Sequence, residues 1–324
     1  MNEIAIGAIG CGGIAGAHLP AYRHIDGIRT VAVCDINEEA ARARAEEFDV
    51  PAVYTDWREL LADDRVDAVS VLLPHHLHCE VAVAAAQAGK HVLTEKPMAT
   101  SLAETDSMIA AADAAGVVLM VGQILRFRPA NIRARELIRA GAIGEVRNIL
   151  RRRLALSGEF RSEWARRPEE AGGWVLYGYG AHEVDMILWL VDGRPETVFA
   201  QGRAVNPYWN DMDDITMQLS LVDGPMATYE HSLNTPFGAW ECMVIGTEGA
   251  MMVESERIRF GDRVVEEPLD SPASWRAQVG EFVRAIREGV EPGPSGRNVR
   301  HTMVALEAAR ISMRDGVAVD ASAL

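Results

Sequence analysis

The stretch that decides the fold is IAIGAIGCGGIAG, residues 4–16. Its first six residues form a short apolar run that predicts a buried strand. Gly10, Gly12 and Ala15 then complete the pattern G-x-G-x-x-A. In that pattern the first glycine permits a tight turn, the second lets the backbone approach a pyrophosphate, and the alanine lets a helix pack close to the sheet. We therefore expect a dinucleotide-binding turn with the phosphates at the helix N-terminus. The alternative is a glycine-rich turn in an α/β domain that binds nothing.

A carboxylate follows this turn at the expected spacing. Residues 30–34 predict a second strand that leads into Asp35, 20 residues after Ala15, where a carboxylate usually binds the adenosine ribose. A carboxylate repels a 2′-phosphate, and the two residues after Asp35 supply no cation, so NAD is favoured over NADP. Asp35 could also cap the helix that begins at Glu38, and the two roles are compatible.

Strands and helices continue to alternate through the first 122 residues. The expected strands are 4–9, 30–34, 68–72, 91–94 and 117–121, and the expected helices are 38–47, 76–88 and 102–115. The strands are continuous Ile, Val and Leu runs, which is typical of a parallel sheet with helices on both faces. We therefore expect an α/β domain of the Rossmann type over residues 1–122.

The pattern changes after Gly122. Long runs with period-two alternation predict strands, and apolar periodicity predicts helices before, among and after them. The expected strands are 146–156, 196–205, 215–222, 226–233, 241–246 and 251–254, and the expected helices are 130–140, 173–190, 273–288 and 299–314. We therefore expect a second domain over residues 123–324, of α+β type, with a large and mostly antiparallel open sheet.

Composition excludes several classes of protein. The 324 residues carry 32 Lys and Arg against 47 Asp and Glu, a formal net charge of −15, which disfavours nucleic acid or an anionic membrane as a partner. No apolar run reaches the ~18 residues of a membrane span, and no basic segment precedes an apolar one at the N-terminus. The four cysteines are too scattered for a disulfide framework. The histidines at 75, 76 and 78 begin one helix without a supporting carboxylate pattern, so no metal site is expected. We expect a soluble, cytoplasmic protein.

Only two of the 32 cations are lysine, Lys90 and Lys96. Lys90 lies at a predicted helix C-terminus, where arginine would interact with the dipole equally well. Lys96 follows the fourth of the expected strands, in the run Thr94-Glu95-Lys96-Pro97. Ligands of open α/β sheets bind outside the carboxyl ends of the strands, so we expect Lys96 in the cofactor crevice, where Pro97 restricts the backbone. In a chain almost without lysine, this position is the sharpest candidate for a chemistry that needs a compact ammonium group.

Together these motifs resemble the Gfo/Idh/MocA oxidoreductase family, which includes glucose–fructose oxidoreductase and inositol dehydrogenase. The matching segments are 10–16, 74–78, 88–97, 123–129, 172–185 and 296–312. The resemblance implies a Rossmann domain that binds NAD(P), and a C-terminal α/β domain that binds the substrate and whose open sheet often forms oligomer contacts. It also implies hydride transfer with sugars, polyols or related compounds. We therefore expect a homo-oligomer, either a dimer or a tetramer, with NAD as cofactor and a small carbohydrate or polyol as substrate.

The resemblance also implies roles for single residues. It places Lys96 and His182 at the reacting carbinol. Family members commonly carry an Asp three residues after that histidine and another Asp four residues before it; the first is Asp185 here, and the second is replaced by Gly178. The other positions expected to bind the cofactor are Gly10, Gly12, Gly13, Ile14, Asp35, Leu73, Pro74, His75, His78 and Glu95, and those expected to contact the substrate are Arg126, Trp164 and Tyr179.

The chemistry of these residues suits the oxidation of an alcohol. Histidine has a pKa suited to removing the hydroxyl proton, and a lysine ammonium can hold the substrate oxygen. His182 and Asp185 stand at i and i+3 and share a helix face, so Asp185 could orient the imidazole. Gly178 and Gly180 disfavour a helix, and we hypothesise that this small-residue stretch admits substrate or backbone close to the nicotinamide. The structural alternatives are a core histidine and a surface carboxylate.

Two further clusters have two interpretations each. Trp164, Trp174, Tyr177 and Tyr179 could stack against a sugar ring or form a small separate core. The three arginines at 151–153 interrupt an expected strand. We expect them to form a charged sheet face or an oligomer contact rather than a phosphate site.

Three functions remain open from the sequence. The first is an NAD-dependent dehydrogenase acting on a hydroxyl of a sugar, cyclic polyol or glycoside. The second is a glycoside hydrolase that oxidises the sugar transiently with bound NAD and produces no net NADH. The third is a non-catalytic NAD-binding regulator, which is expected to lack the lysine or the histidine, although both are present.

Overall fold

The computed structural model describes residues 3–157 and 162–324, and these fall into two compact units. The first unit contains everything described up to Ala99, then Ala103–Ile124 and Ser271–Val299. The second contains Thr100–Leu102, Leu125–Asp270 and Arg300–Leu324. The chain therefore does not divide at a single point near Gly122, because a late segment returns to the first unit.

The first unit is built on a six-stranded parallel sheet in the order β3-β2-β1-β4-β5-β6. Its strands are β1 (Ile4–Ile9), β2 (Ile28–Cys34), β3 (Ala52–Tyr54), β4 (Ala68–Val71), β5 (His91–Thr94) and β6 (Leu119–Val121). Its helices are α1 (Ala15–Tyr22), α2 (Glu38–Phe48), α3 (Trp57–Leu61), α4 (His78–Gln87), α5 (Leu102–Ala115) and α9 (Ser271–Glu288), with a 3-10 turn, η1 (His75–Leu77). This order is that of a dinucleotide-binding Rossmann sheet, so the predicted fold class is confirmed for this unit.

Small side chains let α1 and α2 pack directly on the sheet. Ala15 is fully buried in a cluster that also holds Leu19, Val33 and Ala45. Pro20 lies inside α1, and the helix ends two residues later at Tyr22, since a proline inside a helix kinks or shortens it. The sequence did not predict β3 or α3, because each is only a few residues long.

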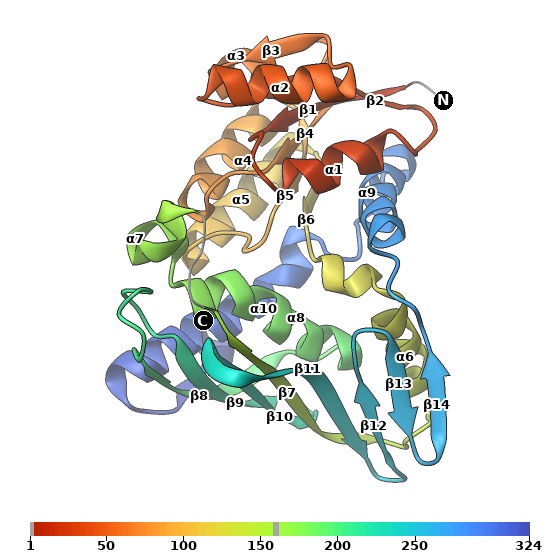
Figure 1. The fold of residues 1–324 in the computed structure, drawn as a ribbon, viewed down its shortest axis with the longest axis vertical. Coiled ribbons are helices and arrows are strands. Elements are labelled where there is room, and N and C mark those ends of the chain that lie inside the picture. Colours follow the sequence, from red (N-terminus) through yellow and green to blue (C-terminus); the bar gives the residue numbers. More distant parts are fainter. Residues whose placement is uncertain (1–2, 158–161) are drawn as a thin grey trace. The chain divides into compact units, whose positions relative to one another are not determined.

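The late segment completes this unit in two ways. Helix α9 lies beside α1 (Figure 1), where the rings of His18 and Trp275 have centres 5.1 Å apart. The chain after α9 then pairs with the open edge of β6: Val121 N–H donates to Pro294 O at 2.9 Å. An edge strand has unpaired backbone groups, and this pairing satisfies part of them.

The second unit is built on a nine-stranded sheet in the order β14-β13-β12-β11-β7-β10-β9-β8-β15. Its strands are β7 (Val146–Leu156), β8 (Pro195–Arg203), β9 (Asp214–Leu221), β10 (Met226–Ser232), β11 (Asn234–Gly246), β12 (Ala250–Val253), β13 (Arg257–Phe260), β14 (Arg263–Glu266) and β15 (Val319–Asp320). Its helical elements are η2 (Ile124–Phe127), α6 (Pro129–Arg139), η3 (Glu163–Arg166), α7 (Pro168–Ala171), η4 (Trp174–Tyr179), α8 (Gly180–Val191), α10 (Gly296–Asp315) and η5 (Ala321–Ala323). All strand pairs are antiparallel except β7 with β10, so the predicted large open sheet is confirmed.

Helices cover one face of this sheet. Helices α8 and α10 lie over one face, which we call the inner face (Figure 1). The alternation of β7 places Ile149 and Arg151 toward α8, whereas Leu150 and Arg152 are exposed on the opposite, outer face. The helix predicted over 173–190 is divided: it begins as a π-helical segment, η4, and continues as α8. No helix in the described part of the chain is both long and apolar enough to cross a membrane.

Candidate functional site

The predicted cofactor residues gather at one edge of the parallel sheet. Residues 10–14 follow β1, Asp35 follows β2, residues 73–75 follow β4, and Glu95 and Lys96 follow β5. These four strands are neighbours in the order β2-β1-β4-β5. The carboxyl ends of parallel strands meet at one edge, and the change of strand order between β1 and β4 opens a crevice there. One edge of the first unit therefore carries all of these groups.

The glycine turn has the shape that a pyrophosphate needs. Gly10 has φ = +103°, and a Cβ there would lie 2.2 Å from Leu72 O, so no other residue fits. Nothing lies within 4 Å of a Cβ built on Gly12 or Gly13, which leaves their outer side open. The backbone N–H groups of Gly12, Gly13 and Ile14 have no hydrogen-bond partner among the residues that the structure describes. Free N–H groups at the start of α1 form a cradle for an anion.

Asp35, which is expected to bind the ribose, also fixes the glycine turn. Its Oδ2 accepts a hydrogen bond from Cys11 N–H at 2.8 Å, and its Oδ1 accepts one from Asn37 N–H at 2.9 Å. The cap of α2 is Asn37, whose side chain accepts from the N–H groups of Glu39 and Ala40. The alternative role of Asp35 as the N-cap of α2 is therefore wrong, because Asn37 caps that helix.

Arg44 is a cation near the turn that sequence reasoning missed. It projects from α2, and its guanidinium donates to the carbonyls of Cys11 and Gly12, each at 3.3 Å. Its Nη1 also pairs with Glu47 at 2.6 Å. No sequence motif predicts this contact, because it depends on how α2 packs beside α1.

His78 ties two loops of this edge together. Its ring nitrogens lie 2.8 Å from Pro97 O and 2.8 Å from Leu73 O. Burial lowers the pKa of His78, although both carbonyl partners oppose this effect. The ring therefore links the loop after β4 to the Glu-Lys-Pro segment, and it is a positioning group for Leu73 and Pro97.

Glu95 directly precedes Lys96, and its side chain is buried among close neighbours. Its Oε1 lies 2.8 Å from His18 Nε2 on α1, and its Oε2 accepts from the Lys96 N–H at 3.2 Å. A Cβ on Gly122 would approach Oε1 to 2.7 Å, so any larger residue there would have to displace this carboxylate. Burial alone would raise the pKa of Glu95, but the hydrogen bond and charge of His18, together with Lys96, lower it. The carboxylate thus keeps its negative charge beside the lysine.

The second lysine has a structural reason of its own. Lys90 Nζ donates to the carbonyl oxygens of Asp63 at 3.1 Å and Val66 at 2.7 Å. Lys90 therefore has backbone partners that the sequence did not predict, and the expectation that arginine would interact with the helix dipole equally well stays a prediction.

In the second unit, Asp185 is held by groups other than His182. The two residues lie on α8 as predicted. The Asp185 carboxylate is buried and accepts from Arg126 Nε at 2.7 Å and Nη2 at 2.6 Å, and from Thr302 Oγ1 at 3.1 Å. The expected orientation of His182 by Asp185 is therefore not seen. Arg126, expected at the substrate, has its charge balanced by this buried ion pair.

Gly178 and Gly180 are explained by packing. A Cβ on Gly178 would lie 3.0 Å from Trp174 Cε3, and one on Gly180 would lie 3.2 Å from Leu306 Cδ2. The indole of Trp174 already fills the space beside position 178. Packing against Trp174 and Leu306 thus accounts for both glycines, and the hypothesis that this stretch admits substrate or backbone close to the nicotinamide stays a prediction.

Three of the four residues of the expected aromatic cluster lie together and Trp209 joins them, whereas the Tyr177 hydroxyl donates to Glu307 instead. Trp174 lies at the centre of the cluster, with the ring centres of Trp164 and Tyr179 each 5.6 Å away and that of Trp209 6.4 Å away in a stacked arrangement. Trp174 and Trp209 are almost completely buried, so this part forms a small core. Tyr179 is less buried and borders it.

The three arginines at 151–153 do not share one face. Arg152 lies on the outer face, where it pairs with Glu241. Arg151 and Arg153 lie on the inner face and both pair with Glu183 of α8, which is 1% exposed. The expectation of a single charged sheet face is wrong for these two, because strand alternation sends neighbouring side chains to opposite faces.

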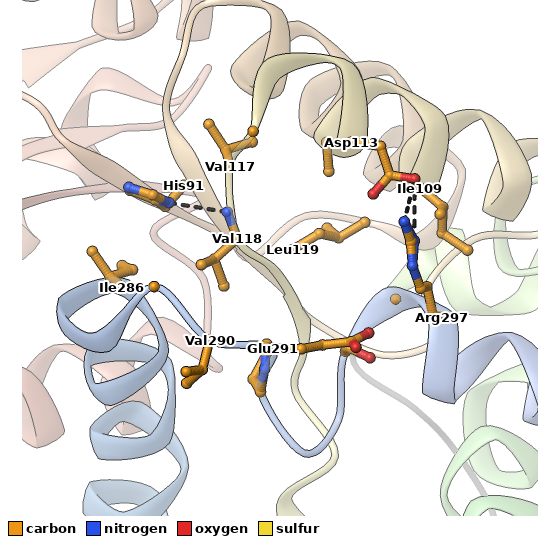
Figure 2. A pocket seen from close by; sticks show the side chains of 16 residues that line it. His91, Ile109, Asp113, Val117, Val118, Leu119, Ile286, Val290, Glu291 and Arg297 are labelled. Carbon is orange, nitrogen blue, oxygen red and sulfur yellow. Dashed lines mark hydrogen bonds and ion pairs between the residues drawn. The ribbon is translucent and has the colours of Figure 1, made fainter.

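A separate pocket of about 330 Å³ lies at the opposite edge of the first unit. It is bounded by the start of β5, the start of β6 and the chain after α9 (Figure 2). Figure 2 shows the Asp113–Arg297 ion pair at one side and the hydrogen bond from Val118 N–H to His91 Nδ1, 3.0 Å long, at the other. Because ligands of such sheets bind at the carboxyl edge, we do not assign the nucleotide to this pocket.

No group of three His, Cys, Asp or Glu residues that could hold a metal ion is found within residues 3–157 and 162–324.

The chain matches two family profiles that together span most of its length. Residues 4–123 match one described as "Oxidoreductase family, NAD-binding Rossmann fold", and residues 132–252 match the "GFO/IDH/MocA C-terminal domain".

Individual relatives align with nearly the whole chain. The 4-carboxy-2-hydroxymuconate-6-semialdehyde dehydrogenase of Sphingobium sp. is 30% identical, over 90% of this chain and 92% of its own. The D-xylose 1-dehydrogenase (NADP(+)) 2 of Haloferax volcanii is 31% identical, over 89% and 91%. The crystal structure of aldose-aldose oxidoreductase from Caulobacter crescentus, complexed with glycerol, superposes with a TM-score of 0.89 at 26% identity, over 98% of this chain and 100% of that one.

The His18–Glu95 contact predicts a change in pH dependence. His18→Leu removes the hydrogen-bond donor, so burial then raises the pKa of Glu95. Glu95 will take up a proton at higher pH, and the acidic limb of the kcat/KM profile for the enzyme's substrate will move to higher pH. His18→Gln keeps a side-chain N–H but not the charge, so its limb is expected to lie between those of the wild type and His18→Leu. Identical profiles for wild type and His18→Leu would show that His18 only packs.

The close fit at position 178 predicts a loss of stability. Gly178→Ala and Gly178→Asp both add a Cβ against the Trp174 indole, and overpacking of this kind costs about 1–3 kcal/mol. We expect Tm to fall in both variants, with a change in the near-ultraviolet circular dichroism of the tryptophans. If Gly178→Asp kept the wild-type Tm and altered only the pH–rate profile, the steric explanation would be refuted.

Proposed function

Because the chain belongs to the Gfo/Idh/MocA oxidoreductase family, we propose that it is an NAD-dependent enzyme that transfers a hydride between a hydroxyl-bearing carbon of a sugar, cyclic polyol or glycoside and the nicotinamide. The observation that carries this proposal is the single sheet edge at which the open glycine turn, Asp35 and the Glu95–Lys96 pair follow neighbouring strands. The names of two relatives, a D-xylose dehydrogenase and a semialdehyde dehydrogenase, agree with a small oxidisable substrate.

The first unit fits a dinucleotide without further change. The unpaired N–H groups of residues 12–14 suit its pyrophosphate, and Asp35 suits an unphosphorylated ribose. We propose NAD as the cofactor rather than NADP, because the Asp35 carboxylate repels a 2′-phosphate. Arg44 does not reverse this preference, since Glu47 and two backbone carbonyls already engage its guanidinium.

A bound nicotinamide supplies the hydride acceptor or donor for this chemistry. The chain's own residues manage the proton and the charge. We propose that the Lys96 ammonium holds the substrate oxygen and stabilises its negative charge, and that His182 removes the hydroxyl proton during oxidation. The negative charge of Glu95, kept by its contact with His18, supports the positive charge of Lys96.

Asp185 contributes to the same proposal as a positioning residue. Its carboxylate clamps Arg126 in a two-point ion pair and also accepts from Thr302 on α10. Breaking a buried ion pair of this kind leaves an unpaired buried charge, which is strongly destabilising. We propose that this clamp keeps α8, and with it His182, in a fixed place within the second unit.

We propose in addition that the chain forms a homo-oligomer in the cytoplasm. The outer face of the nine-stranded sheet carries a hollow of about 280 Å³ lined by Leu150, Thr228, Met243 and Met252, among others. Strands with apolar side chains on an uncovered face favour pairing with another protein surface, and a second copy of this face offers the matching one. All four cysteines are free thiols, as expected in a reducing compartment.

The function is tested by measuring NADH formation with a panel of aldoses, cyclic polyols and glycosides, with NAD and NADP in parallel. We expect NADH from at least one compound, and a higher kcat/KM with NAD than with NADP. A free sugar released from a glycoside without net NADH would favour the transient-oxidation hydrolase. Tight NAD binding without turnover on any compound would favour the regulator.

Lys96→Arg is expected to bind NAD and to fold like the wild type but to lose most turnover. The guanidinium keeps the charge, yet it is planar and larger, and it remains protonated at all pH values of interest. Steady-state kinetics and NADH-fluorescence binding measure the two properties separately. Turnover close to that of the wild type would refute the role of Lys96.

Leu150→Glu is expected to convert the oligomer to a smaller species, because it places a charge in the centre of the outer-face hollow. Sedimentation velocity measures the change, and Arg147→Gln in the same strand is the control. An unchanged sedimentation coefficient in Leu150→Glu would exclude this face as the interface.

A further inference from the structure

Three side chains form a row across the inner face of the nine-stranded sheet. Arg153 of β7 lies opposite His231 of β10 on one side and opposite Trp240 of β11 on the other. The Arg153 guanidinium carbon lies 4.7 Å from the centre of the Trp240 ring and 4.5 Å from that of Tyr179. Arg153 is therefore held between two aromatic rings, both of which favour a cation.

The charges around this row do not balance. Glu183 is the carboxylate that pairs here, and most of its capacity is used by Arg151, whose Nε lies 2.5 Å from Oε2. Arg153 reaches Glu183 only through Nη1, at 3.2 Å. The Arg128 guanidinium carbon lies 4.4 Å from the centre of the Trp240 ring, and this guanidinium has no hydrogen bond or ion pair to any residue that the structure describes.

Three guanidinium groups thus surround one carboxylate in a partly dehydrated place. Because Arg128 and Arg153 both contact the Trp240 ring, their guanidinium carbons are no farther apart than the two ring distances together. Burial lowers the pKa of Arg128, and the charges of Arg151 and Arg153 act in the same direction against Glu183. An arginine nevertheless remains charged in proteins. The excess positive charge is costly unless an anion accompanies it.

His231 adds a hydrogen-bond donor to this row. Burial, with the charge of Arg153, lowers the pKa of His231 to about 3, so the ring is neutral. The Tyr229 hydroxyl, whose pKa burial raises, lies 2.6 Å from His231 Nδ1. When this hydroxyl donates to Nδ1, the proton of the neutral ring lies on Nε2, which is buried without a hydrogen-bond partner in the described structure. An unpaired buried N–H of this kind is costly as well.

We propose that Arg153 and Arg128, with the His231 N–H, bind a carboxylate of the substrate, so that the enzyme acts on a sugar acid or a related hydroxy acid in preference to a neutral sugar. This rests on the proposed hydride transfer. A planar carboxylate accepts two parallel hydrogen bonds from a guanidinium edge. A single negative charge also suits a chain of net charge −15 better than a phosphate dianion does.

The position of the row agrees with such a role. Tyr179, whose ring contacts Arg153, precedes His182 by three residues, and Glu183 follows His182 directly. Tyr179, which borders the carboxylate site, is therefore about one helical turn along the chain from the histidine proposed to take the proton.

The experiment compares matched acid and neutral compounds on the NAD-loaded protein. The pairs are D-glucuronate with D-glucose and D-galacturonate with D-galactose, and D-glucose 6-phosphate tests the phosphate alternative. We expect the acid to exceed its neutral partner at least about tenfold in kcat/KM, the ratio that a charge-assisted hydrogen bond supplies. Arg153→Gln and Arg128→Gln are expected to lower kcat/KM far more for the acids than for the neutral sugars, and so to remove this ratio.

Matched variants separate binding from packing. Arg147→Gln removes the same charge from the same strand, six residues and about 20 Å from Arg153, and is expected to keep the acid preference. Arg153→Lys keeps the positive charge and is expected to retain part of the preference for the acids. Equal values for acid and neutral partners in the wild type would overturn the proposal, as would an equal loss for both in Arg153→Gln. A preference for the phosphate over both acids would overturn the carboxylate assignment.

Calorimetric titration of the same compounds into the NADH-loaded protein makes the result independent of turnover. If no compound yields NADH, the proposed function fails, yet binding of the acid that is at least about tenfold tighter, and lost in Arg153→Gln, still supports the carboxylate site. Equal binding of acid and neutral partners overturns it whatever the turnover.

Discussion

The turn at Gly10 is the constraint on which the first unit depends. Its φ of +103° and the Leu72 carbonyl against its Cα allow no side chain there. Because the chain turns so tightly, α1 begins immediately above β1, with three unpaired N–H groups at its start. The direction of α1 also places His18 beside Glu95, which lies 77 residues later in the chain. One backbone conformation thus shapes the phosphate cradle and also sets the charge next to Lys96.

In the second unit, α8 is anchored through two buried carboxylates. Glu183 pairs with Arg151 and Arg153 of the sheet, and Asp185 pairs with Arg126 of the preceding segment. His182 lies directly before the first of these anchors, so its backbone has little freedom. Such pairs are weak evidence for stability, because desolvation opposes the Coulomb gain. Their stronger effect is to define one position and one rotation of the helix. The arginines not neutralised in this way, Arg128 and part of Arg153, are the ones left to meet a ligand.

The two lysines show what the amino-acid composition of this chain can predict and what it cannot. Lys96 was singled out because arginine replaces lysine almost everywhere else. Lys90 was expected to be exchangeable, yet its ammonium is held by the carbonyls of Asp63 and Val66. The partners of Lys90 became visible only in the structure, because they belong to the loop before β4.

The sequence by itself determined the parallel sheet, the glycine turn, the carboxylate at 35 and most strand and helix bounds, such as Val146–Leu156, because these depend on local periodicity and on glycines without a substitute. It did not determine which groups meet. That Asp185 binds Arg126, that Trp174 fills the space at Gly178, and that Arg151 and Arg153 turn inward while Arg152 turns outward were decided by the tertiary structure. The physical reason is that these contacts join residues far apart in the chain, and a side chain's partner follows from the packing of whole elements rather than from its neighbours in sequence.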